Sequence, residues 1–291
     1  MNTATVEKIA NAVLYDGYML YPYRLSSVKN QQRFNFGVLY PLDYRALDDG
    51  ADASEMRTEC IIQQQGDSAT IEAKIRFLRM VERRDWQEGH EREVSTPAVD
   101  LRSIMNRPMR RPFTFADGVL QGEWELGATQ LDGALFRVAL VIRNLGHCGG
   151  VSRDQAMLKS FVSVHSILHA GGGEFVSSLD PPAEFKSAVA QCKSVGAWPV
   201  LAGDEGQRNL ILSSPIILDD YPQIAPEDPA KGEESRAPRI LALTAAETVE
   251  VGNGGDRALG TLERTEMLPT EQFKKLHGTL RSLRSPSGVN R

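Results

Sequence analysis

Two histidines, His165 and His169, stand four residues apart in a segment whose apolar residues recur at helical spacing. On a helix both imidazoles point to one side, as two ligands of one metal ion must. His147 and Cys148 precede this segment, and the four side chains have the ligand types of zinc, nickel or iron. The residues therefore allow a transition-metal site. The alternative is that His165 packs in the core and His169 faces solvent at a helix C-terminus, where its charged form is favoured.

Other catalytic patterns are missing from the sequence. The H-E-x-x-H motif of metallopeptidases requires a glutamate directly after the first histidine, but no glutamate stands between His165 and His169. The sequence has no G-x-S-x-G motif. The glycines at 171–173 follow a helix-like segment, whereas the glycines of a phosphate-binding loop follow a strand. We therefore predict a non-enzymatic protein. The alternatives are a metal-binding protein or metal-dependent enzyme that uses His165 and His169, and a structural subunit of a larger complex.

Tyrosines are concentrated near the N-terminus, where six of the seven fall between residues 15 and 44. Arginines and a lysine are interleaved with them, and tyrosine together with arginine is the composition of binding hot spots. We predict that this tyrosine-rich segment binds another protein, and the residues that carry the prediction are Tyr15, Tyr18, Tyr21, Tyr23, Arg24 and Arg33. The alternative is a β-sheet core whose tyrosines reach solvent with their hydroxyl tips.

Charge and cysteine content limit the partners and the compartment. The net charge is −5, whereas proteins that grip phosphate backbones carry a basic excess, so nucleic acid is not the expected partner. Three widely spaced cysteines make a disulfide framework improbable and fit a reducing compartment. The start of the sequence lacks the pattern of a secretory signal, and no apolar run approaches the ~20 residues that span a bilayer. We expect a cytoplasmic protein without membrane insertion.

The first 150 residues are predicted to be β-rich. Residues 60–65 and 69–81 flank Gly66-Asp67-Ser68, which predicts a hairpin, and residues 118–126 and 135–145 flank a second turn. In the last run the residues of one face are almost all apolar, as a half-buried strand requires: Phe136, Val138, Leu140, Ile142 and Asn144. Repeated short strands with turns between them indicate an antiparallel sheet or sandwich.

From residue 151 onward the pattern becomes mixed. Ser152 and Gln155 form a capping-box pattern before a helical stripe that extends to Leu168. Asp180-Pro181 predicts the start of a second helix, and residues 197–202 and 210–218 are strand-like. A proline-rich loop follows at 221–238, and a closing amphipathic helix is predicted at 270–283. We therefore predict an α+β fold, with a β-rich part (residues 1–150) and a mixed α/β part (residues 151–291); one continuous domain is the alternative.

Several stretches resemble an uncharacterised bacterial protein family associated with [NiFe]-hydrogenase gene clusters. They are LYDGYMLYPYRLSSVKNQQRFNFGVLYP, SFVSVHSIL followed by GGEFVSSLDPP, and LSSPIILDDYPQIAPEDP. The resemblance spans residues 14 to 283, although the loop after Pro226 is short and altered against the family pattern. It implies an accessory or maturation role with a hydrogenase subunit or maturation factor as partner, and it supplies no catalytic residues.

Overall fold

The computed structural model describes residues 3–11, 14, 37–44, 53–82, 87–115 and 118–222. The chain divides into two compact units, Met1–Gln223 and Ile224–Arg291. All described residues belong to the first unit, and the description below concerns that unit alone. The predicted helix at 270–283 and the proline-rich segment beyond residue 222 lie outside the described residues.

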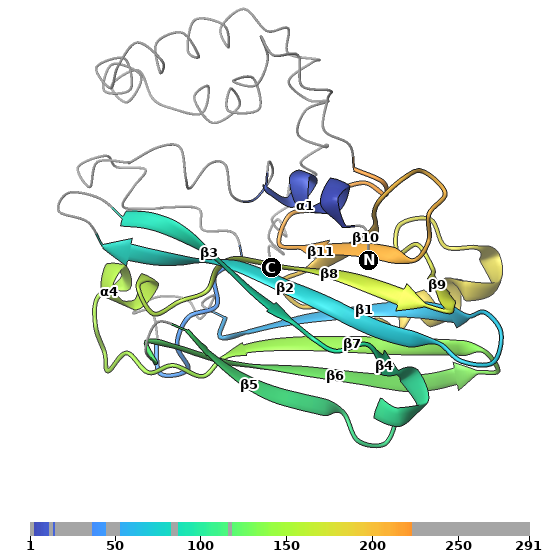
Figure 1. Ribbon diagram of the computed structural model, residues 1–291, viewed down its shortest axis with the longest axis horizontal. Coiled ribbons are helices and arrows are strands. Elements are labelled where there is room, and N and C mark those ends of the chain that lie inside the picture. Colours follow the sequence, from blue (N-terminus) through green and yellow to red (C-terminus); the bar gives the residue numbers. More distant parts are fainter. Residues whose placement is uncertain are drawn as a thin grey trace, which may run out of the picture. The chain divides into compact units, whose positions relative to one another are not determined.

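Two antiparallel sheets, stacked as two layers, build the first unit (Figure 1). The first sheet has the strand order β5 (Met109–Phe115), β6 (Leu120–Asp132), β7 (Leu135–Asn144), β1 (Glu55–Gln64) and β9 (Gly173–Phe175). The second sheet has the order β10 (Trp198–Leu201), β11 (Leu210–Ser214), β8 (Val162–Gly171), β2 (Thr70–Glu82) and β3 (Gln87–Ser95), and β4 (Val99–Asp100) also pairs with β2.

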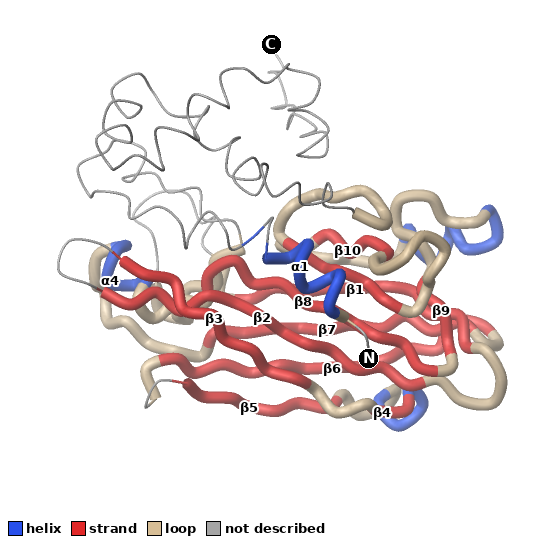
Figure 2. The backbone as a smooth tube through the Cα atoms, turned by 45° about the horizontal axis from the view of Figure 1, so that its top comes forward, coloured by secondary structure: helices blue, strands red, loops and turns tan. Residues whose placement is uncertain are grey.

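Helical segments of the described residues are short and lie outside the two sheets (Figure 2). They are α1 (Ala4–Ala10), the 3-10 helix η2 (Leu101–Ile104), α4 (Arg153–Met157), the 3-10 helix η3 (Ala183–Phe185) and α5 (Lys186–Ala190). The strands that follow residue 150 join the same two sheets as the earlier ones. The protein is therefore mainly β, and the predicted α+β class with a mixed α/β second part is wrong.

The main error concerns residues 152–168. The capping box is present, because the side chains of Ser152 and Gln155 each contact the other residue's backbone, and α4 begins there as predicted. However, α4 ends at Met157, and β8 follows. The first seven residues of β8 are all buried, on both faces of the strand. A strand that is buried on both faces need not alternate between apolar and polar residues, so the apolar residues of β8 also match a helical period.

The predicted hairpin around Gly66 is also wrong, although both of its strands exist. β1 pairs with β7 and β9, whereas β2 pairs with β3, β4 and β8. The chain therefore crosses from one sheet to the other at residues 65–69. Turn residues such as Gly66 set a change in chain direction, but they do not specify the pairing partner of the strand that follows the turn.

The hairpin of β6 and β7 is confirmed, and so is the buried face of β7. Its inward residues, from Phe136 to Asn144, are at most 1% exposed. They pack with the inward residues of β2 and β8, such as Ile75 and Leu168, in the core between the two sheets. In this core the apolar side chains on one face of each sheet are removed from water. Burial of apolar surface is the main favourable free-energy term in folding.

The outer face of the second sheet is covered by α1 and neighbouring segments (Figure 1). Val6 and Ile9 of α1 belong to a second apolar cluster with Ile167 of β8 and Leu212 of β11. An ion pair between Glu7 and Lys74 of β2, with Nζ and Oε1 2.6 Å apart, fixes the helix on the sheet. Helix α1 thus contributes apolar contacts to the fold.

The edge strand β10 is closed by side chains and by the chain that follows it. Pro199 has no backbone N–H, and its carbonyl oxygen accepts a hydrogen bond from the Ser178 hydroxyl. The N–H of Leu201 donates to the Asp220 carboxylate, and its carbonyl oxygen accepts from the N–H of Tyr221. The second Asp220 oxygen accepts from the Ser177 hydroxyl. The outward backbone groups of β10 are therefore already occupied.

Within the described residues, no helix has the length and apolar character that crossing a membrane requires.

A glycine substitution at the end of β8 tests the packing of this fold. Gly172 has φ +65°, and a methyl group there would lie 2.5 Å from the Ser68 carbonyl oxygen. Gly133 has φ +47°, but nothing lies within 4 Å of the corresponding position. We expect Gly172→Ala to lower the free energy of unfolding by about 1–3 kcal/mol more than Gly133→Ala, because only the first also displaces backbone. Urea denaturation measures both, and equal losses would contradict the assigned contact.

Candidate functional site: the end-loop cluster

His165 and His169 lie on β8 and not on a helix. Along an extended strand, residues four apart share a face but are about 13 Å apart, which is too far for two ligands of one ion. His147 and Cys148 belong to the loop after β7. The described part of the chain contains no group of three or more His, Cys, Asp or Glu side chains arranged to hold a metal ion. The structure therefore does not bring the four predicted ligands together.

His165 is fully buried on the outer face of the second sheet, the face that carries Ile167. Its Nδ1 lies 2.8 Å from the Ser163 carbonyl oxygen, and it is paired in register with Arg76 of β2. Burial lowers the pKa of His165 to about 3, and the charge of Arg76 adds to this effect although the contact with Ser163 opposes it. The imidazole is therefore neutral at physiological pH, as the packing alternative requires.

Cys148 and the residue after it are held by one carboxylate, that of Asp43. One Asp43 oxygen accepts from the N–H of Cys148 (2.8 Å), and the other accepts from the N–H of Gly149 (3.0 Å). These two backbone hydrogen bonds lower the pKa of Asp43 to about 2. Burial and the nearby Asp43 raise the pKa of the Cys148 thiol, so Cys148 does not have the low pKa of a nucleophilic cysteine.

The six residues proposed for protein binding, Tyr15, Tyr18, Tyr21, Tyr23, Arg24 and Arg33, lie outside the described residues. The last two tyrosines of the segment are described. Tyr40 is buried, and its ring stacks on that of Tyr44 with centroids 4.6 Å apart. The Tyr40 hydroxyl accepts a hydrogen bond from Nε of Arg153 in α4. These two tyrosines therefore pack the protein's own outer cluster instead of projecting from it.

A buried amide fixes the loops at this end of the sheets. Asn144, the last residue of β7, is fully buried, and its Nδ2 donates to the carbonyl oxygens of Leu39 and Lys159 at 2.9 Å each. Its Oδ1 accepts from the N–H of Gly146. Leu39 also forms an isolated β-bridge with Phe161, which precedes β8. One side chain thus ties three segments that are far apart in sequence.

We call residues 39–44 and 144–150 the end-loop cluster. At its surface Leu42 is 50% exposed, although its own N–H is bonded to the Gly146 carbonyl oxygen. A second exposed apolar residue, Val119, precedes β6, whose residue Gln121 accepts a hydrogen bond from the N–H of Leu145. The cluster therefore presents apolar side chains on backbone that is held in place by hydrogen bonds.

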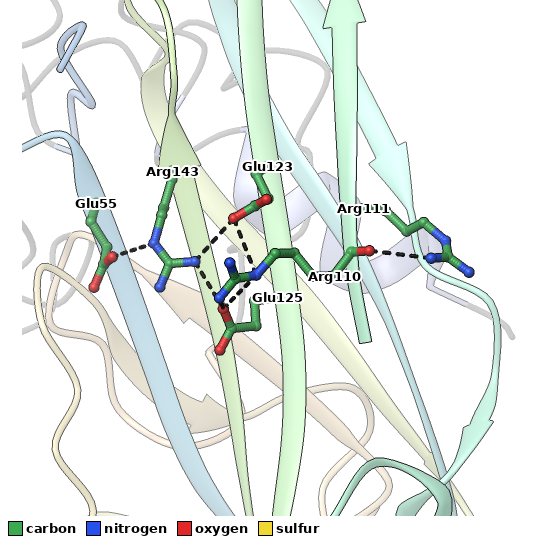
Figure 3. Close-up of polar contacts among 6 residues, drawn as sticks. All are labelled: Glu55, Arg110, Arg111, Glu123, Glu125 and Arg143. Atoms are coloured by element: carbon green, nitrogen blue, oxygen red, sulfur yellow. Dashed lines mark hydrogen bonds and ion pairs between the residues drawn. The ribbon is translucent and has the colours of Figure 1, made fainter. Parts of the chain in front are cut away.

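A second polar feature lies on the outer face of the first sheet, where charges of alternating sign cross four strands (Figure 3). Arg143 of β7 contacts Glu55 of β1 at 2.6 Å and Glu125 of β6 at 3.0 Å, and Arg110 of β5 pairs with Glu123 and Glu125. Burial raises the pKa of Glu125, but hydrogen bonds from the two arginines outweigh this and hold it below its usual range. These charges satisfy one another, as cross-strand pairs do, so they stabilise the sheet.

The residues that shape the end-loop cluster were not proposed as a site from the sequence. Asn144 was correctly placed on the inward face of its strand, and a polar residue in an apolar series is itself a signal of a buried hydrogen-bonding role. Asp43 and Leu42 carry no comparable signal, since their partners lie more than 100 residues away.

No family model matches this chain, and no curated protein matches it.

The buried His165 predicts a pH dependence of stability. Its folded pKa of about 3 is below the usual 6.5, so between these values the unfolded chain binds a proton that the folded protein does not. Stability is therefore expected to fall as the pH decreases through this window. Between pH 6 and 5 the contribution approaches about 1.4 kcal/mol per pH unit, and His165→Leu should remove that slope. Urea denaturation at each pH measures it, and an unchanged slope in the variant would refute the assignment.

Replacing the Asp43 carboxylate should expose the neighbouring thiol. Asp43→Asn removes the charge and one of the two acceptors that hold residues 148 and 149, so we expect iodoacetamide to modify Cys148 several-fold faster at neutral pH. Mass spectrometry of the digested protein gives the rate for each cysteine. Cys60, which is buried in the core, is the internal control. A parallel rise at Cys60 would show global unfolding and contradict a local role.

Proposed function

We propose that this chain is a non-enzymatic accessory protein that binds another protein through the end-loop cluster and the tyrosine-rich segment that precedes it. The observation that carries the proposal is the half-exposed side chain of Leu42, which lies on a loop whose backbone is held by hydrogen bonds. The Asp43 carboxylate and the Asn144 amide hold that loop against the end of β7.

Rigid presentation matters because ordering a loop on binding costs free energy. The hydrogen bonds of Asp43 and Asn144 already fix the loop before a partner arrives, so the apolar contact of Leu42 is not offset by ordering the backbone. Few residues dominate the energy of a protein interface, and they are surrounded by polar contacts. The exposed His147 beside Leu42 fits that arrangement.

The position of the cluster in the chain supports the same surface. Residues 39–44 are the end of the tyrosine-rich segment, whose composition is that of binding hot spots. The described end of that segment is anchored in the second apolar cluster through Tyr40. The resemblance to the family of [NiFe]-hydrogenase gene clusters makes a hydrogenase subunit or a maturation factor the proposed partner.

Substitution of Leu42 tests this function. A tagged Leu42→Asp variant, expressed in native cells, is expected to recover at least about tenfold less of the partner than wild type, since loss of one interface hot spot costs about 2 kcal/mol or more. Quantitative mass spectrometry of the pull-down measures the recovery.

The matched control is Leu179→Asp, because Leu179 is 52% exposed but lies near β10 and not in the end-loop cluster. It should recover the partner as wild type does. Recovery of neither a hydrogenase subunit nor a maturation factor by wild type would refute the proposed partner. Equal recovery by the two variants would refute the proposed surface.

A further inference from the structure

A polar cleft of about 470 Å³ opens where β8 and β9 meet, away from the end-loop cluster. Its volume lies within the range of small-molecule sites, about 300–1,000 Å³. The glycines at 171–173 form one wall, and residues 207–209 form another. The second wall is fixed, because the Asn209 carbonyl oxygen accepts from Ala170 and the Arg208 carbonyl oxygen accepts from Phe175.

His169 is oriented in this cleft by its neighbours. Its Nδ1 lies 3.0 Å from Oε1 of Glu72, and because a carboxylate only accepts, Nδ1 is the donor of this contact. Its other ring nitrogen, Nε2, lies 3.4 Å from Nδ2 of Asn209. The ring is therefore held on both sides, and it forms a fixed part of the cleft wall.

Two opposite charges flank the cleft. Glu174 of β9 and Arg208 both line it and are both exposed, and they lie on neighbouring segments since Phe175 is bonded to Arg208. Among the described residues neither side chain forms an ion pair, in contrast to the charges of the first sheet. The amide side chains of Gln65, Gln207 and Asn209 also line the cleft.

We propose that this cleft binds a small zwitterion of the dipeptide class. Arg208 would hold the ligand's carboxylate, because its planar guanidinium matches that group, and Glu174 would hold the ammonium. The amide side chains offer donors and acceptors to the peptide group. The site is separate from the proposed protein-binding surface and does not depend on it.

Calorimetric titration of the full-length protein with glycylglycine tests the proposal. Binding is expected for wild type, and Arg208→Gln and Glu174→Gln should each weaken it by at least tenfold, about 1.4 kcal/mol. Glu174→Gln keeps the side-chain length and removes only the charge, whereas Arg208→Gln removes the whole guanidinium group and shortens the side chain. Arg111→Gln is the matched control, because Arg111 is an exposed arginine of β5 outside the cleft, and it should bind as wild type does.

Titration with acetate and with methylamine separates the two charges. Each carries only one end of the zwitterion, so each should bind at least tenfold more weakly than glycylglycine. The proposal is overturned if wild type gives no binding heat at millimolar glycylglycine, or if acetate binds as tightly as glycylglycine. Equal affinity in wild type and both cleft variants would also overturn it.

Discussion

The contact on which the rest of the fold depends is a group of phenylalanines between the two sheets. Phe77 of β2 and Phe161 beside β8 have ring centroids 4.6 Å apart, and Phe113 of β5 lies 5.6 Å from Phe161. Gly122 of β6 faces these rings, and a methyl group there would collide with Phe113 and Phe161. Three strands and the residue before β8, from both sheets, therefore meet at one point that tolerates no added atom, as expected of a densely packed interior.

The end-loop cluster is built on that contact. Phe161 exchanges backbone hydrogen bonds with Leu39, and Gly122 is the register partner of Asn144. The position of Leu42 at the surface thus follows from aromatic packing in the interior, through the amide of Asn144. Loops that rest on a rigid scaffold in this way are common places for binding residues.

What the sequence could predict depended on whether a signal was local. The alternation of β7 and the capping box before α4 were both read correctly, because each depends only on nearby residues. The partner of β1 and the nature of β8 were not, since both are decided by which apolar faces meet across the core. The same reason explains the site. Asp43 accepts a hydrogen bond from the N–H of Cys148, which lies 105 residues later, and no spacing pattern in the sequence predicts this contact.

Glycines 171–173 illustrate the same limit. The sequence pattern places this run after a helix, but it begins at the last residue of the strand β8, and the reason for the glycines is spatial. Cβ atoms at Gly172 and Gly173 would meet the backbone oxygen of Ser68 and the side chain of Ile62. Only glycine lets β8 turn into β9 so close to the crossing between the sheets, and the polar cleft opens beside that turn.

The closed edge of β10 has a consequence for how this protein behaves at high concentration. An open strand edge is a template on which identical chains can add strands and grow into aggregates. Pro199, Ser178 and Asp220 together leave β10 no free group with which to begin such growth. A protein with half-exposed leucines such as Leu42 and Leu179 is at risk of self-association, and this closed edge removes one route to it.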